Sequence, residues 1–178
     1  ETRDVIPECE TDSVLSDGDE LVLKGPSGSV SWTVLATPGH SPGHIALASD
    51  VGVVSGDLAV VVGTILVPSA DGDMDDYLAS LERVRDLFPP MLFPAHGPLS
   101  PTPEKLLEHY ISHRRARHHR VLEAVNSGLT TLAEISESAY ADTSGAHPIL
   151  KLDQTLSHLH SHERTGAIRK TESGWESA

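Results

Sequence analysis

The sequence predicts an α+β protein in which a small sheet precedes a run of helices. Two observations carry this prediction. Short apolar runs, separated by turns rich in Gly, Pro and Asp, fill the first third of the 178 residues, and apolar residues at helical spacing follow from position 73. With 38% hydrophobic residues but only two Trp, three Tyr and two Phe, the chain can bury one sizeable core or two small ones, made mostly of aliphatic side chains.

Five short strands are expected in the first part of the chain. The apolar runs at 20–23, 30–35, 45–48 and 51–54 are separated by short polar connections, a pattern typical of strands that pair antiparallel as a meander. A fifth strand is expected at 91–93. These strands would form the sheet of the α+β fold.

The longest apolar run without a charged residue covers residues 58–67. It is well short of the ~20 residues that a membrane-spanning helix needs, so we expect no membrane partner. We interpret the run as a buried strand or as an apolar loop beside a site that includes His40 and Asp57. The first residues are polar and acidic, unlike a signal peptide, and residues 1–16 are expected to be irregular. Cys9 is the single cysteine and cannot form an internal disulfide, which favours a cytoplasmic location.

An amphipathic helix is expected over residues 73–88. Its apolar residues recur at steps of three and four, and Pro89 and Pro90 end it. The acidic residues in its first turn, Asp73, Asp75 and Asp76, complement the helix dipole. Capping the helix needs no further partners, so we favour capping over metal binding for this cluster.

Three further helices and a small hairpin are expected after residue 100. The first begins at the N-cap Thr102 and extends to Val125, the second is short and opens with a Thr131–Glu134 capping box, and the third begins at Pro148 and ends at Gly166. The residues from 168 to 175 look like a two-stranded wing. Helix, helix, helix, wing is the order of a winged-helix domain.

Two features of this region bear on ligand binding. Residues 113–120 hold seven side chains that can carry positive charge, which we interpret as a solvated helix face, with phosphate binding as the less favoured alternative. His158 and His162 are four residues apart and could chelate a metal, but no third ligand is evident, so a pair facing water is preferred. Nucleic-acid-binding residues therefore cannot be named from the sequence, and the region is interpreted as a packing or substrate-orienting module.

The net charge of −13 is unevenly distributed. Up to residue 108 there are 5 Lys and Arg against 18 Asp and Glu, or 5 − 18 = −13, whereas the remainder has eight of each. Eight of the eleven histidines lie in that neutral remainder, so it becomes positive as the pH falls toward ~6.5. A strongly acidic protein is a poor general binder of polyanions, although a neutral module with local basic clusters can still contact a phosphate backbone.

Three strand ends carry residue types that bind metal ions. The loop from Ala36 to His44 contains two prolines, two glycines and the histidines His40 and His44, while Asp57 and His96 each follow another predicted strand. Loops from one sheet edge converge, so His40, Asp57 and His96 are the candidate ligands. Two imidazoles and a carboxylate suit zinc or another borderline divalent ion.

The motifs at these positions resemble those of a known family. Thr37-Pro-Gly-His40, Ser55-Gly-Asp57 and Pro94-Ala-His96-Gly, in this order, look like the third, fourth and fifth metal motifs of the metallo-β-lactamase superfamily. The residues from 71 to 83 and the histidine- and arginine-rich segment after residue 100 further resemble its lactamase-beta-2-like branch, which contains endoribonucleases and other hydrolases. The resemblance extends over nearly the whole chain.

One departure from the family pattern is plain. The His-x-His-x-Asp-His motif, which supplies four metal ligands and lies upstream of the Thr-Pro-Gly-His loop, does not occur in this sequence. The chain therefore resembles the C-terminal part of an αββα metallo-β-lactamase sandwich, over residues 1–108, followed by a winged-helix-like domain over residues 109–178. We expect the upstream half of the fold, or a second copy in a homodimer, to cover the sheet face that a single layer leaves open.

The resemblance also implies a reaction and a set of roles. In such enzymes His40 would bind one zinc ion, Asp57 would bridge two, and His96 would bind the second, while His44 would support the site without binding metal. Zinc hydroxide would attack an ester, a thioester or a phosphodiester, so the substrate is a small molecule or RNA. Because the chain lacks the His-x-His-x-Asp-His motif, it is expected to be inactive alone. The alternative is a non-catalytic interaction or nucleic-acid-binding protein that uses its winged helix.

Overall fold

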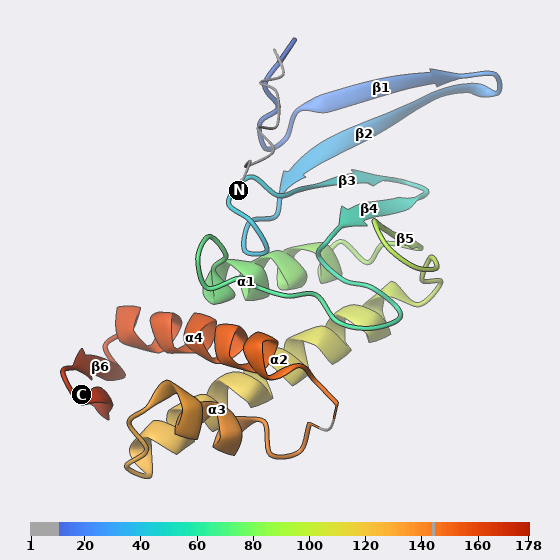
Figure 1. Ribbon diagram of the computed structural model, residues 1–178. Coiled ribbons are helices and arrows are strands. Elements are labelled where there is room, and N and C mark those ends of the chain that lie inside the picture. The colour runs from blue at the N-terminus through green and yellow to red at the C-terminus, as the bar shows by residue number, and fades with distance from the viewer. Residues whose placement is uncertain (1–10, 144) are drawn as a thin grey trace, which may run out of the picture.

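The chain has a computed structural model that describes residues 11–143 and 145–178. Cys9 and most of the lead-in expected at 1–16 lie outside the described residues. Figure 1 shows the order of the elements, with the sheet formed by the first part of the chain and the helices packed below it. The predicted α+β class is confirmed.

The sheet has five strands in chain order. β1 pairs with β2, β2 with β3 and β3 with β4, all antiparallel, whereas β5 joins β4 in parallel. The predicted meander is thus confirmed for the first four strands. The strand bounds are β1 (Glu20–Gly25), β2 (Gly28–Ala36), β3 (Ile45–Ser49), β4 (Gly52–Gly56) and β5 (Leu92–Pro94).

Two helices cover one face of this sheet. α1 (Met74–Arg85) connects β4 to β5, as a parallel pair requires, and α2 (Pro103–Asn126) packs beside it. Asp73 caps α1 by accepting hydrogen bonds from the backbone N–H groups of Asp75 and Asp76, so the predicted capping role is confirmed. The buried core between sheet and helices includes Leu35, Ala46, Val53, Leu58, Val67, Tyr77, Leu81, Leu92, Leu107 and Ile111.

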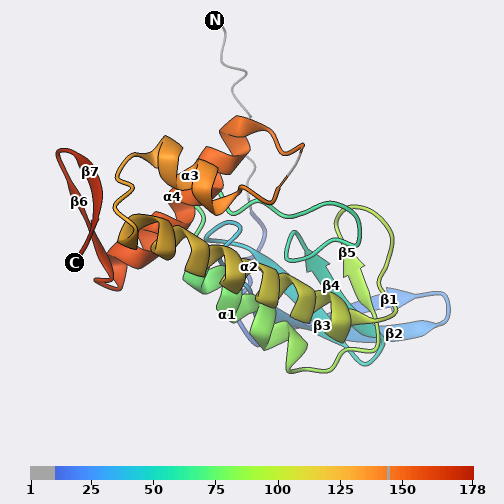
Figure 2. The ribbon, with the colours of Figure 1, turned by 90° about the horizontal axis from the view of Figure 1, so that it is seen from below.

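The opposite face of the sheet carries apolar side chains without a helix over them. The strand register places Leu23, Val30 and Val54 on this face, where they are 58%, 38% and 37% exposed. Figures 1 and 2 show the helices on the other side of the sheet. Within the described residues no helix or second sheet lies over this face, although Val34 on the same face is fully buried.

The second part of the chain forms a smaller core of its own. α3 (Leu132–Ala139), α4 (Pro148–Arg164) and the hairpin β6 (Ile168–Thr171) and β7 (Gly174–Ser177) pack against the last turns of α2. The capping box of Thr131 and Glu134 is present as predicted. α2 passes through the predicted domain boundary at 108 and 109, since its first half joins the sheet core and its second half joins this smaller core.

The basic run at 113–120 is not a fully solvated face. Arg114 and Arg117 are only 3% and 4% exposed. Arg117 donates to the carbonyl of Ala139 and to Asp142, and its guanidinium carbon lies 4.0 Å from the centre of the Tyr140 ring. The prediction is wrong for these two residues because they lie on the side of α2 that faces packed segments, where each guanidinium donates to several acceptors.

The expectation that His158 and His162 face water is also wrong. Both are buried between α2 and α4, at 0% and 4% exposed. The Nδ1 atoms of His118 and His158 are 3.2 Å apart, and the rings of His118 and His162 stack with centroids 3.6 Å apart. His162 also donates from Nε2 to the carbonyl of His118 at 2.9 Å. Neutral imidazoles thus serve as packing groups between the two helices.

Burial makes these imidazoles hard to protonate. Desolvation lowers the pKa of His118 to about 4, with a further contribution from His162, while Asp75 opposes the shift. Desolvation likewise lowers the pKa of His158 and of His162. Because the unfolded chain binds protons near pH ~6.5 and the folded chain does not, the folded state loses stability as the pH falls from about 6.5 toward about 4.

This cluster predicts an acid-sensitive helical region. Between pH 7 and pH 5 the Tm of the chain should fall by on the order of 5 °C. His158→Gln removes one of the buried titrating groups, so its Tm should be lower at pH 7 but should vary less with pH. The exposed His109 provides the matched control, and His109→Gln should keep the wild-type pH dependence. A Tm that is independent of pH in the wild-type chain would refute this interpretation.

Candidate metal centre

The candidate ligands leave the sheet at the same edge. β2, β4 and β5 run in the same direction, because β2 and β4 are both antiparallel to β3 and β5 is parallel to β4. His40 lies in the loop after β2, Asp57 directly follows β4, and His96 follows β5. The sheet topology therefore delivers three side chains that are distant in sequence to one place.

Asp57 lies between the two imidazoles. Its Oδ2 is 3.9 Å from Nε2 of His40, and its Oδ1 is 3.5 Å from Nε2 of His96. The side chains of His40 and Asp57 are each 31% exposed, and that of His96 is 77% exposed. The structure thus brings together the three residues predicted from the sequence, at a place that solvent can reach.

No three His, Cys, Asp or Glu side chains among the described residues form a complete metal-binding group. The arrangement around Asp57 explains this result, because the two histidines contact different carboxylate oxygens. It contains two pairs of candidate ligands, one on each side of Asp57. The ligand role of these residues stays a prediction.

The ring of His40 is oriented by a backbone carbonyl. Its Nδ1 lies 2.8 Å from the carbonyl oxygen of Leu66. A carbonyl only accepts, so Nδ1 carries a proton, and in the neutral ring Nε2 then has its lone pair on the side of Asp57. The preceding Gly39 has φ +126° and lies so close to α1 that a Cβ there would meet the backbone of Tyr77 at 2.3 Å. This contact fixes the loop that carries His40.

Both ring nitrogens of His44 are used by the chain itself. Nε2 accepts the backbone N–H of Asp57 at 3.0 Å, and Nδ1 donates to the carbonyl of Thr37 at 3.0 Å. Desolvation lowers the pKa of His44, which keeps its ring neutral. Gly56 makes room for the ring, since a Cβ at this position would lie 2.6 Å from Nε2. This geometry is compatible with the supporting role predicted for His44.

The donor set fits a borderline divalent ion but does not complete its coordination. Each side of Asp57 offers one imidazole nitrogen and one carboxylate oxygen, which are the donors that zinc takes from proteins. A catalytic zinc has three protein ligands, so a zinc ion on either side of Asp57 would need further protein ligands. In the acidic cluster at the start of α1, Asp73 and Asp75 are paired with Arg164 instead.

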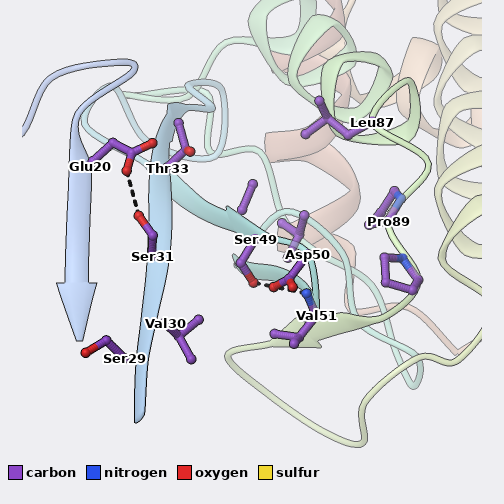
Figure 3. Close-up of a pocket in the computed structure, with 13 residues that line it drawn as sticks. Glu20, Ser29, Val30, Ser31, Thr33, Ser49, Asp50, Val51, Leu87 and Pro89 are labelled. Carbon is purple, nitrogen blue, oxygen red and sulfur yellow. Dashed lines mark hydrogen bonds between the residues drawn. The ribbon is translucent and has the colours of Figure 1, made fainter. Parts of the chain in front are cut away.

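A cavity of about 810 Å³ lies at the other end of the strands. It is lined by the underside of the β1–β2 hairpin, the turn between β3 and β4, and the segment after α1. Figure 3 shows Glu20 accepting a hydrogen bond from Ser31, with Asp50 and Leu87 on the facing walls. None of the four candidate site residues lines it, so it is separate from the candidate metal centre.

Comparison with known proteins supports the resemblance seen in the motifs. The model of the metallo-beta-lactamase superfamily matches residues 10–96, which include all four candidate site residues. This stretch belongs to the metallo-beta-lactamase superfamily. The predicted family is confirmed. Its members are metal-dependent and hydrolase-like.

Two known proteins are similar to this chain in sequence. A protein named beta-lactamase-like protein 2 homolog from Drosophila melanogaster is 34% identical over 124 residues, which cover 67% of this chain and 40% of that protein. A probable metallo-hydrolase from Bacillus subtilis is 28% identical over 162 residues, covering 85% of this chain and 50% of the relative. The chain thus spans no more than half the length of these two relatives.

Solved structures share the fold. A metallo-beta-lactamase family protein from Thermus thermophilus superposes with a TM-score of 0.76 at 22% identity, covering 95% of this chain and 55% of that one. A beta-lactamase domain protein from Burkholderia ambifaria gives a TM-score of 0.75 at 24% identity, covering 92% and 51%. At this level of identity the likeness establishes the fold.

Across the described residues, none of the helices has the length and apolar character to cross a membrane.

Three residues that lie behind the candidate metal centre are missed by sequence reasoning. Leu66 contributes only a carbonyl group, which no sequence pattern marks, and Arg114 and Gln154 contact the segment that carries it. Arg114 belongs to the basic run whose composition predicts a solvated face. Gln154 lies off the side of α4 that carries Leu152, Leu156 and Leu159, so the apolar spacing of this helix does not mark it either.

The contact between Gly56 and His44 gives a prediction for stability. Gly56 has φ +53°, and a Cβ added there would clash with the ring of His44. Gly56→Ala should therefore destabilise the chain by more than the ~1–2 kcal/mol that a left-handed backbone alone costs. Urea denaturation measures the difference. Gly128 also has positive φ, at +95°, but open space around it, so Gly128→Ala is the control with a smaller loss. Equal losses in the two variants would argue against the clash.

Proposed function

We propose that this chain is part of a metal-dependent hydrolase in which His40 binds one zinc ion, His96 binds a second, and Asp57 bridges the two. One observation carries the proposal. The two oxygens of Asp57 face the Nε2 atoms of two different histidines, 3.9 and 3.5 Å away, at the edge where three strands end. A carboxylate between two imidazoles is a natural bridging ligand.

The residues of the chain have separate tasks in this proposal. His40 presents Nε2 because its Nδ1 proton is bound by the carbonyl of Leu66. His44 holds the backbone of Asp57 and thereby aims its carboxylate, and the exposed His96 borders the open side of the centre. A bound zinc pair would lower the pKa of a water ligand and stabilise negative charge on the substrate. The substrate class is an ester, a thioester or a phosphodiester, including RNA.

The proposal includes a partner, because the chain supplies only half of what the centre needs. Each metal position has two donors from this chain, and one face of the sheet leaves Leu23, Val30 and Val54 exposed. The upstream half of an αββα sandwich would supply both the missing ligands and a second sheet. A second copy of this chain would cover the same face but bring no new ligand type.

The competing function, a nucleic-acid-binding winged helix, has less support. Arg114, Arg115, Arg117 and Arg120 of the basic run all donate to acceptors within the chain. On α4, His158 and His162 are buried. Few free cations are therefore left on the described parts of the helices that would contact a phosphate backbone, and phosphate contacts dominate such binding.

Zinc titration tests the proposed ligands. The isolated chain should bind zinc weakly, and His40→Ala, Asp57→Ala and His96→Ala should each reduce the affinity at least tenfold in isothermal titration calorimetry. The matched control is His109→Ala, a change at an exposed histidine of α2 that should leave the affinity unchanged. Adding the upstream half should tighten binding and produce hydrolysis of a phosphodiester or thioester substrate.

Two results would contradict this proposal. Strong stoichiometric zinc binding by the chain alone would mean that the centre is already complete. Unchanged binding in the Asp57→Ala variant would mean that the zinc ions occupy another place.

The exposed sheet face gives an independent prediction. Without its covering layer the chain should self-associate at micromolar concentration, because apolar area is removed from water. Leu23→Glu combined with Val54→Lys should shift the chain to a monomer in light scattering. Ile149 is also exposed, at 67%, but lies at the start of α4, so Ile149→Lys should leave the association unchanged. A wild-type monomer would count against the open face as a docking surface.

A further inference from the structure

Four side chains hold the loop that lies behind the candidate metal centre. Residues 58–67 form neither helix nor strand, although Leu58, Val60, Ile65 and Val67 are buried. Buried backbone groups need hydrogen-bond partners, and a loop without regular structure must take them from side chains. The partners are Tyr77 on α1, Tyr110 and Arg114 on α2, and Gln154 on α4.

The side-chain amide of Gln154 pairs with both backbone groups of Val67, as a neighbouring strand would. Its side-chain Nε2 donates to the carbonyl of Val67 at 2.8 Å, and its Oε1 accepts the N–H of the same residue at 3.3 Å. Arg114 donates from Nη1 to that Oε1 at 3.0 Å, which fixes the direction of the amide. Gln154 and Arg114 are only 5% and 3% exposed, so water cannot replace these bonds easily.

Arg114 also binds the loop directly. It donates from Nη2 to the carbonyl of Ile65, and its guanidinium lies 5.5 Å from the centre of the Tyr77 ring. The carbonyl groups of Ile65 and Val67 are therefore both held by the two buried side chains. Leu66 lies between them, and its own carbonyl accepts the Nδ1 proton of His40.

We propose that Gln154 and Arg114 are positioning residues for His40, acting through the backbone of residues 65–67. This inference rests on the proposed metal-ligand role of His40 and extends it to the helical second part of the chain. By fixing the carbonyl of Leu66, the pair holds the His40 ring in the tautomer with the proton on Nδ1. The lone pair of Nε2 is then directed to the side of Asp57 before any metal arrives.

The tautomer of His40 can be read without metal. In the metal-free chain a two-bond proton–nitrogen NMR spectrum should show His40 with its proton on Nδ1, assigned by loss of its signals in His40→Gln. Gln154→Leu keeps the volume of the side chain but removes both bonds to Val67. In this variant the signals should move toward the Nε2-protonated form that free histidine side chains favour, and zinc affinity should fall about tenfold or more.

Thr155 provides the matched control on the same helix. It is fully buried, and its hydroxyl donates only within α4, to the carbonyl of Lys151. Thr155→Val should destabilise the helix to a similar degree while leaving the His40 tautomer unchanged. If Gln154→Leu fails to fold, Gln154→Glu keeps a partner for Arg114 but loses the donor to Val67, and it should show the same change in smaller degree.

The outcomes separate the two proposals. A folded Gln154 variant with an unchanged His40 tautomer overturns the positioning role, whatever the zinc affinity. A changed tautomer in this variant, with a wild-type chain that binds no zinc even after the upstream half is added, supports positioning of His40 and removes the metal-ligand role. A tautomer change of equal size in Thr155→Val would reduce the effect to general destabilisation and overturn the inference.

Discussion

The structure depends on three strands that run in the same direction and end at one sheet edge. Because β2, β4 and β5 all point toward that edge, His40, Asp57 and His96 meet although they lie far apart in the chain. α1 makes this possible by returning the chain to the start of β5, which allows a parallel pair with β4. This topology produces the two contacts of Asp57 on which the functional proposal rests.

The remaining contacts serve to hold these strand ends still. Gly56 admits the ring of His44 against the backbone of Asp57, and Gly39 admits α1 against the loop of His40. From the other side, Arg114 and Gln154 of the helical region donate hydrogen bonds to residues 58–67, a loop that forms neither helix nor strand. The second part of the chain is therefore joined to the centre by specific polar contacts, and α2, which contributes to both cores, links them further.

Much of this arrangement is predictable from the sequence, because turns and apolar periodicity are local signals. The meander, the capping of α1 by Asp73 and the Thr131 capping box follow from such patterns. The burial of Arg114 and His158 could not be predicted in the same way, since a basic or polar residue becomes buried only where a distant segment offers a partner. The carbonyl of Leu66 leaves no trace in the sequence at all.

The most direct test of the account is anomalous diffraction at the zinc edge from crystals of the protein grown with zinc. Peaks should lie on the two sides of the Asp57 carboxylate, one within coordinating distance of Nε2 of His40 and the other within that distance of Nε2 of His96. His44 should remain bound to the backbone of Asp57, away from both peaks. Zinc bound by His44, or found only at other histidines with none beside Asp57, would contradict the account.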